Sequence, residues 1–312
     1  MKRHFCLLTL AFCLLTCLCA GCSSRSPSTG QPRIGVVLKA LDSEFWLAVK
    51  RGADSAAAGK AELGMVAPDR EINIDQQVSM IEDQISRGVA ALIVAPAASA
   101  QVIPALEKAA ARSIPVIIVD TDVDWPKKVT YVGTNNDEGG KLAGQFVAKS
   151  VAGKAQIGLI VGVPGEQTHE GRKRGFKQVL AGEPRLELVS EQPANSERAL
   201  AMNVMENMLT ARPQLAAVFV TSDQMALGAH EAIQARRSGS PVRLVSFDAG
   251  REVLQLVRQG KIDAVVAQRP YQMGKLSVEA ALKAIAKQPV DRVIDTGTAL
   301  ITRENVASFR VE

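Results

Sequence analysis

The sequence predicts an α/β protein made of two Rossmann-like, doubly wound lobes. The chain has 312 residues, which is more than one hydrophobic core usually supports. Short apolar runs typical of strands alternate with longer helical patterns, as in βαβ units that build a parallel sheet. Aromatic residues make up only 4% of the chain, and the Ala, Val, Ile and Leu that fill the apolar positions suit parallel strands covered by helices.

The first half of the chain supplies the elements of one sheet. Apolar runs predict strands at 34–38, 90–95 and 116–119, with a shorter fourth at 130–133. Apolar residues at three- and four-residue spacing predict helices at 45–63, 76–87 and 98–112. The stretch 64–74 fits neither pattern clearly, and a degenerate strand near Val66 would complete the alternation.

The second half repeats this plan. Strands are predicted at 156–161, 186–190, 217–220, 244–247 and 264–267. Helices are predicted at 170–180, 197–211, 224–235, 251–258 and 272–286. In open sheets of this kind, ligands bind outside the carboxyl ends of the strands. The residues that follow each strand are therefore the candidates for a binding site.

All five cysteines lie within the first 22 residues. This placement excludes a disulfide framework or a cysteine-based metal site in the rest of the chain. The same segment has a basic start, an apolar run and the small residues Ala20 and Gly21 before Cys22, which is the pattern of a secretion signal. The apolar run is shorter than the ~20 residues that a membrane-spanning helix needs.

This leader resembles a bacterial lipoprotein signal, in which the cysteine after the cleavage site is acylated. Cys19 stands at the third position before the cut, where Leu is usual, and Leu18 lies one place earlier. The resemblance implies a lipoprotein signal peptide at 1–22, lipidation at Cys22 and a flexible polar linker at 23–31. A plain cleaved signal peptide is the alternative.

Charge and motifs exclude several classes of protein. The formal charge of +5 falls by two, to +3, once Lys2 and Arg3 leave with the leader. The basic run at 172–174 is interpreted as a solvated helix face, and the absence of a basic stripe with interleaved aromatic residues argues against a nucleic-acid partner.

The sequence has no G-x-G-x-x-G, P-loop or G-x-S-x-G motif, so we expect no enzyme activity and no cofactor. No histidine has a partner at ligand spacing, so we expect no metal site, and His169 is expected at a pocket edge or on the surface.

Seven segments, in their order and spacing, resemble a known family. They are LDSEFW at 41–46, QISRGVAALIVAP at 84–96, IPVIIVD at 114–120, GTNN at 133–136, SDQMALG at 222–228, SFD at 246–248 and AQ at 267–268. From about residue 34 to residue 302, the chain resembles the periplasmic sugar-binding proteins of the ribose- and galactose-binding type, which feed ABC importers.

The resemblance implies the type I periplasmic binding protein fold, in which a three-crossing hinge joins the two lobes. We expect the crossings near Thr134, Gln268 and Asp295. The implied lobes are an N-terminal lobe of 32–134 plus 269–295 and a C-terminal lobe of 135–268 plus 296–312.

A sugar presents flat apolar faces and an edge of hydroxyls, so its site needs aromatic side chains together with directed donors and acceptors. In the N-terminal lobe, the positions that match ligand-binding positions of the family are Asp42, Ser43, Phe45, Trp46, Asp120 and Thr121. Ser43 stands where Asn is common, and Thr121 stands where the ribose-binding branch often has Arg. The alternatives are core packing for the two aromatic residues and a turn or cap role for Asp120.

In the C-terminal lobe, the matching candidates are Glu170, Arg172, Ser196, Ser222, Asp248 and Gln268. Glu170 aligns with a ligand-binding Arg of the family, and Arg172 lies two places later. Ser196 stands where an aromatic residue is sometimes found, and a cap for the helix near Glu197 is its alternative role. Asp223 is expected mainly as a helix cap. Asp248 is the strongest candidate of the set, and a cap for the helix near Arg251 is its alternative.

The sequence thus predicts an extracytoplasmic binding protein that captures a monosaccharide, cyclitol or similar polyol and delivers it to the membrane subunits of an ABC importer. We expect a monomer in the bacterial cell envelope, in the periplasm or on the outer face of the membrane, held by its lipid anchor. A ligand sensor that feeds a chemoreceptor or signalling partner is the alternative. A transcription regulator with similar lobes would carry an N-terminal helix-turn-helix where this chain has a signal and linker.

Overall fold

The computed structural model describes residues 30–236 and 241–310. Pro32–Glu312 forms one unit of the chain. The predicted signal peptide with Cys22, and all but the end of the predicted linker, lie outside the described residues. Among the described residues, no helix combines the length and the apolar character that crossing a membrane requires.

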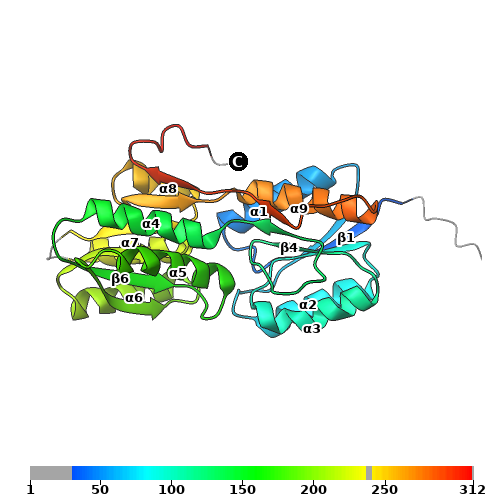
Figure 1. Ribbon diagram of the computed structural model, residues 1–312, viewed down its shortest axis with the longest axis horizontal. Coiled ribbons are helices and arrows are strands. Elements are labelled where there is room, and N and C mark those ends of the chain that lie inside the picture. The colour runs from blue at the N-terminus through cyan, green and yellow to red at the C-terminus, as the bar shows by residue number, and fades with distance from the viewer. Residues whose placement is uncertain (1–29, 237–240, 311–312) are drawn as a thin grey trace, which may run out of the picture. The chain divides into compact units, whose positions relative to one another are not determined.

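Two six-stranded sheets form the framework of this unit (Figure 1). The first sheet has the order β11-β5-β4-β3-β1-β2 and consists of β1 (Arg33–Val37), β2 (Glu62–Val66), β3 (Ala91–Val94), β4 (Val116–Val119), β5 (Thr130–Gly133) and β11 (Val293–Asp295). The second has the order β12-β10-β9-β8-β6-β7 and consists of β6 (Ala155–Val161), β7 (Leu186–Pro193), β8 (Leu215–Val220), β9 (Arg243–Phe247), β10 (Ala264–Ala267) and β12 (Ala299–Thr302). All pairings are parallel except the antiparallel pair of β10 and β12. Each strand of one sheet therefore has a counterpart in the other, and β4 corresponds to β9.

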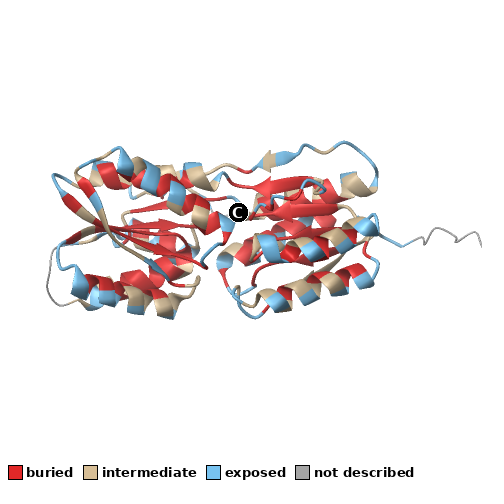
Figure 2. Cartoon of the chain, turned by 60° about the horizontal axis from the view of Figure 1, so that its bottom comes forward, coloured by how far each residue is buried: buried red, intermediate tan, exposed pale blue. Residues whose placement is uncertain are grey.

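Helices cover both faces of each sheet, as in doubly wound folds. Around the first sheet lie α1 (Glu44–Ala57), α2 (Ile74–Ser86), α3 (Ser99–Ala111) and α9 (Pro270–Ile285). Around the second lie α4 (Asn136–Ser150), α5 (Gln167–Ala181), α6 (Arg198–Ala211), α7 (Asp223–Ala235) and α8 (Arg251–Arg258). Buried apolar side chains form one cluster on each face of each sheet, and Figure 2 shows the buried residues concentrated in the strands and on the inner sides of the helices.

The chain passes between the two sheets three times. The passages lie between β5 and α4, between β10 and α9, and between β11 and β12. The predicted fold class, two doubly wound lobes with a three-crossing hinge, is confirmed. We call the part around the first sheet the N-terminal lobe and the part around the second sheet the C-terminal lobe.

Some details of the sequence prediction were wrong, among them the strands β11 and β12, which it did not include. The helix predicted at 45–63 ends at Ala57, because the chain turns into β2, the degenerate strand expected near Val66. Helix α4 was not predicted, because Gly139 and Gly140 near its start weaken helix propensity.

Packing explains why α4 nevertheless forms with glycine. A Cβ atom on Gly140 would lie 2.1 Å from the carbonyl oxygen of Arg172, and one on Gly175 would lie 2.0 Å from that of Asp137. The two glycines thus allow the backbones of α4 and α5 to touch. This close approach fixes the position of α5, which carries Arg172 into the site described below.

Candidate ligand-binding site

A cavity of about 280 Å³ lies between the two lobes. Its size is near the lower end of small-molecule pockets. The N-terminal lobe lines it with Lys39, Asp42, Ser43, Phe45, Trp46, Arg70, Glu71, Ile72 and Asp120. The C-terminal lobe lines it with Thr168, His169, Arg172, Asn195, Ser196, Glu197, Arg198, Ala199, Ser222, Asp223, Gln224 and Asp248. The cavity lies at the carboxyl ends of the strands in both lobes, where doubly wound sheets bind ligands.

A buried ion cluster joins the two lobes beside this cavity. The ammonium of Lys39, a residue only 2% exposed, lies 2.8 Å from Oε1 of Glu166 in the other lobe and 3.2 Å from Oδ2 of Asp120 in its own. Burial alone would lower the pKa of Lys39, but the two carboxylates outweigh it and hold the pKa above its ordinary value. Lys39 is therefore charged at any physiological pH.

Glu166 connects this cluster to the start of α5. It is the N-cap residue of α5, and its carboxylate accepts hydrogen bonds from the backbone N–H groups of Thr168 (3.1 Å) and His169 (3.2 Å). The hydroxyl of Thr121 lies 2.8 Å from Oε1 of the same carboxylate. Burial raises the pKa of Glu166, but the charge of Lys39, together with hydrogen bonds from the side chains of Lys39 and Thr168, holds it well below its usual range. The N-terminus of α5 is thus fixed against the other lobe by an ionised carboxylate.

Asp248 is held by two residues that meet at the C-terminal side of the cavity. Nη1 of Arg172 lies 3.3 Å from Oδ2 of Asp248 and donates to the carbonyl oxygen of Thr221 at 2.8 Å. Nε2 of Gln268 donates to Oδ1 of Asp248 at 2.6 Å. The guanidinium of Arg172 also lies 3.8 Å from the ring centre of Phe247. The interpretation of this basic run as solvated is therefore wrong for Arg172, which is 3% exposed.

The α8 cap offered as an alternative role for Asp248 is not present. Gly250 occupies the N-cap position of α8, and the backbone N–H of Arg251 at the start of this helix donates to the carboxylate of Glu44 in the other lobe. The carboxylate of Asp248 instead lines the cavity, where burial raises its pKa and the charge of Arg172 opposes that rise. Asp248 is therefore placed as an oriented acceptor at the cavity wall.

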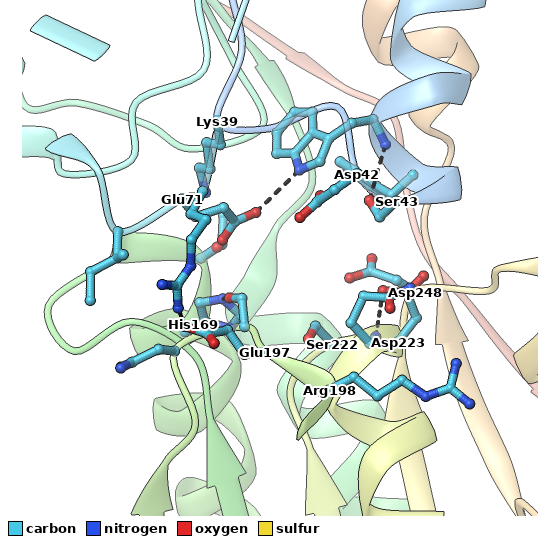
Figure 3. Close-up of a pocket in the computed structure, with 18 of the residues that line it drawn as sticks. Lys39, Asp42, Ser43, Glu71, His169, Glu197, Arg198, Ser222, Asp223 and Asp248 are labelled. Atoms are coloured by element: carbon cyan, nitrogen blue, oxygen red, sulfur yellow. Dashed lines mark hydrogen bonds and ion pairs between the residues drawn. The ribbon is translucent and has the colours of Figure 1, made fainter. Parts of the chain in front are cut away.

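Asp223 lies beside Asp248 (Figure 3) and is 5% exposed. The sequence suggested a helix cap, but Ser222 holds the N-cap position of α7 and Asp223 is the first helical residue. Its Oδ1 accepts a hydrogen bond from the backbone N–H of Gln224 at 2.7 Å. Burial, reinforced by the negative charge of Asp248, raises the pKa of Asp223 to about 8. The pair therefore retains a proton at neutral pH.

His169 lines the cavity and is 5% exposed, so of the two places that the sequence left open, the pocket and not the surface is the one it takes. Its Nδ1 lies 2.9 Å from Oγ1 of Thr221, and its Nε2 lies 3.1 Å from Oγ of Ser196. Ser196 makes this contact instead of capping α6, whose N-cap position is held by Glu197. Burial lowers the pKa of His169 to about 3 although Glu166 opposes the shift. The imidazole is therefore neutral in the folded protein.

Trp46 and Phe45 form an aromatic wall in the N-terminal lobe. Their rings meet edge to face with centres 4.9 Å apart. Trp46 is 4% exposed and packs into the core, while its Nε1 donates to Oε1 of Glu71 at 3.1 Å. Ser43 caps α1 by accepting a hydrogen bond from the backbone N–H of Trp46 at 3.5 Å. The core packing that the sequence offered as an alternative is thus present for Trp46, which also lines the cavity.

Two carboxylates stand on unusual backbone at matching places in the two lobes. Asp120 directly follows β4 and Asp248 directly follows β9, and their φ angles are 64° and 69°. This left-handed region is uncommon for residues other than glycine and costs energy. Both strained residues line the cavity. The same backbone turn thus places a carboxylate on each side of the site.

Most of the predicted site residues meet at this cavity. Those that line it are Asp42, Ser43, Phe45, Trp46, Asp120, Arg172, Ser196, Ser222 and Asp248. Thr121 is fully buried behind the wall, and Gln268 lines a neighbouring cavity while holding Asp248. Glu170 is absent from the lining and pairs on α5 with Lys173, at 2.6 Å.

Sequence reasoning missed Lys39, Glu71 and Glu166. Lys39 directly follows the first apolar run. A search for cations, as well as for carboxylates, at the ends of the predicted strands would have found it. Glu71 lies in the stretch that had no clear pattern. Within residues 30–236 and 241–310, no group of three or more His, Cys, Asp and Glu residues is arranged to hold a metal ion.

Comparisons with known proteins agree on one family. A model of the periplasmic binding protein domain matches residues 34–289. The ribose import binding protein of Bacillus subtilis is 32% identical over 96% of this chain and 98% of its own, and that of Escherichia coli is 34% identical over 83% and 88%. Among solved structures, an ABC transporter periplasmic solute-binding protein from Actinobacillus succinogenes with bound D-allose has a TM-score of 0.84 and 30% identity, covering 89% of this chain and 100% of that one. A Bacillus halodurans solute-binding protein with bound myo-inositol also has a TM-score of 0.84, at 29% identity, covering 91% of this chain and 98% of that one.

The depressed pKa of His169 predicts a specific pH dependence of stability. The unfolded chain binds a proton at this residue below about pH 6.5, whereas the folded protein does so only near pH 3. Unfolding free energy is therefore lost as the pH falls through this window. His169→Gln should reduce the loss between pH 7 and pH 5 by up to about 2 kcal/mol, measured by urea denaturation. Equal losses in the native and His169→Gln proteins would contradict the assignment.

Proposed function

Since the chain belongs to the periplasmic binding protein family, we propose that it captures a small sugar or related polyol outside the cytoplasm and delivers it to the membrane subunits of an ABC importer. The observation that carries the proposal is the cavity of about 280 Å³ lined from both lobes by carboxylates, an arginine and aromatic rings. Relatives named as ribose import binding proteins, and solved structures holding D-allose and myo-inositol, support the same ligand class.

The cavity wall offers each kind of contact that a polyol needs. Asp120 and Asp248 accept hydrogen bonds from ligand hydroxyls, and Arg172 donates to ligand oxygens. Trp46 and Phe45 supply apolar surface for the face of a ring. The acceptors project from both lobes, so a ligand that bridges them is bound only when the lobes are together.

Ligand capture then works as a hinge motion. Contacts from both lobes favour the closed arrangement, because only that arrangement makes both sets at once. The contacts of Glu166 with Lys39 and Thr121 also cross between lobes and stabilise the same arrangement. We assign 32–134 plus 269–295 to the N-terminal lobe and 135–268 plus 296–312 to the C-terminal lobe. A monomer suffices for this motion because one chain supplies both walls of the cavity.

Ribose itself fits the site poorly. The arginine pair that the ribose-binding branch uses corresponds to Thr121 and Glu170 in this chain. Thr121 points its hydroxyl at Glu166, and Glu170 pairs with Lys173. Neither replaces the rigid fork of donors that an arginine presents. We therefore propose a hexose, cyclitol or similar polyol in place of a pentose.

Asp248→Ala should weaken binding by about 10²–10⁴-fold, because the variant loses up to two charge-assisted hydrogen bonds to ligand hydroxyls. Thermal-shift screening of D-ribose, D-allose, D-fucose and myo-inositol would identify a ligand, and calorimetric titration would give its affinity. Asp291→Ala, which removes an exposed carboxylate outside the cavity, is the matched control. Native affinity in the Asp248→Ala protein would refute the ligand role.

We also propose that Cys22 becomes the acylated N-terminus and holds the protein at the membrane. The small residues before it and the polar segment after it support this role. Mass spectrometry of the membrane fraction should show a diacyl or triacyl adduct on Cys22, and Cys22→Ser should release the protein into the soluble fraction. A Cys22→Ser protein that stays in the membrane fraction would show that the anchor lies elsewhere.

A further inference from the structure

The cavity contains more acid than its own cations neutralise. Each cationic side chain that lines it is already paired with a carboxylate. The pairs are Lys39 with Asp120 and Glu166, Arg172 with Asp248, Arg70 with Glu197, and Arg198 with Glu231 and Glu252. Among the described residues, none of the ion pairs involves Asp223, and the hydrogen bond that its carboxylate accepts comes from a backbone N–H.

The surroundings of Asp223 are themselves acidic. Asp248 lies beside it and Asp42 faces the pair across the cavity (Figure 3). Glu44, on α1 of the other lobe, also approaches: a Cβ built on Gly250 would lie 3.0 Å from Oδ2 of Asp223 and 3.3 Å from Oε2 of Glu44. The guanidinium of Arg172 is directed at Asp248. This corner of the cavity therefore gathers the carboxyl groups of Asp42, Glu44, Asp223 and Asp248, and Arg172 pairs with Asp248.

An unpartnered acceptor lies in the same corner. The hydroxyl of Ser222 is buried and has no hydrogen-bond partner among the described residues, and the residue is 8% exposed. Ser222 lines the cavity next to Asp223. Buried polar groups are rarely left without a partner unless a ligand or water supplies one. The corner thus presents two carboxylates and one hydroxyl, which matches the three N–H donors of an ammonium group.

We propose that the ligand is a sugar or cyclitol that carries a protonated primary amine, held in this corner by Asp223, Asp248 and Ser222. The proposal rests on the proposed function and narrows its ligand class. An ammonium supplies the charge that the corner lacks and a donor for each acceptor. The same corner disfavours uronic acids and sugar phosphates, because their anions would face the carboxyl groups of Asp223 and Asp248.

The protonation of Asp223 gives the proposal a second consequence. Burial and the neighbouring carboxylates raise the pKa of this residue to about 8, so the Asp223–Asp248 pair holds a proton at pH 6.5. An ammonium takes the place of that proton, and about one proton is released to the buffer for each ligand bound. A neutral sugar can accept a hydrogen bond from the protonated carboxyl and releases none.

The experiment compares amines with their hydroxyl counterparts on the native protein. D-glucosamine, D-galactosamine and scyllo-inosamine would be titrated at pH 6.5 beside D-glucose, D-galactose and scyllo-inositol, in two buffers of different ionisation enthalpy. At least one amine should bind about 100-fold more tightly than its counterpart, and the difference in heat between buffers should correspond to about one released proton. Asp223→Asn should remove most of this preference and the proton release, whereas Asp291→Asn should change neither.

The other possible results distinguish failure of the amine proposal from failure of the proposed sugar-binding function. Binding of the hydroxyl compounds with equal or higher affinity and without proton release overturns the amine and leaves the binding of sugars intact. An amine preference that survives Asp223→Asn in a protein with a native melting curve overturns the role of Asp223. If neither set binds, and D-ribose, D-allose and myo-inositol do not bind either, the proposed function fails together with the amine.

Discussion

The buried contact between Lys39 and Glu166 is the constraint on which the rest of the site depends. Lys39 follows β1 in one lobe, and Glu166 starts α5 in the other. Removing either partner of a buried ion pair leaves an uncompensated charge and costs roughly 3–5 kcal/mol. Because Asp120 and Thr121 join the same cluster, the contact fixes the ends of β1, β4 and α5 relative to one another. It thereby sets the spacing of the cavity walls.

Because the two lobes repeat the same topology, each contributes an equivalent aspartate to the site. Strands β4 and β9 occupy equivalent places in the two sheets, and each is followed by an aspartate in the left-handed region. The packing of the sheets holds this strained backbone, and the strained conformation directs both carboxylates toward the same cavity. The two aspartates differ in their charged neighbours. Lys39 forms an ion pair with Asp120, whereas a second acidic residue, Asp223, lies next to Asp248.

Much of this arrangement could be predicted from the sequence, and the limits have physical causes. Alternating strand and helix patterns predicted the lobes. The tendency of ligands to bind at the carboxyl ends of parallel strands, together with the family resemblance, predicted Asp120 and Asp248 at the cavity. Helix α4 was missed because its glycines serve packing against α5, which no local pattern reveals. The partnership of Lys39 with Glu166 could not be predicted, because it depends on how two lobes far apart in the sequence meet. The same holds for the burial of His169 and Asp223.

Closure of the two lobes around a small ligand is the motion on which the proposed function depends. Small-angle scattering of the protein, first alone and then saturated with the compound that binds most tightly, tests it most directly. We expect a smaller radius of gyration with the ligand than without it, and no change with a sugar that gives no thermal shift. An identical scattering profile with and without a saturating ligand would contradict this closure.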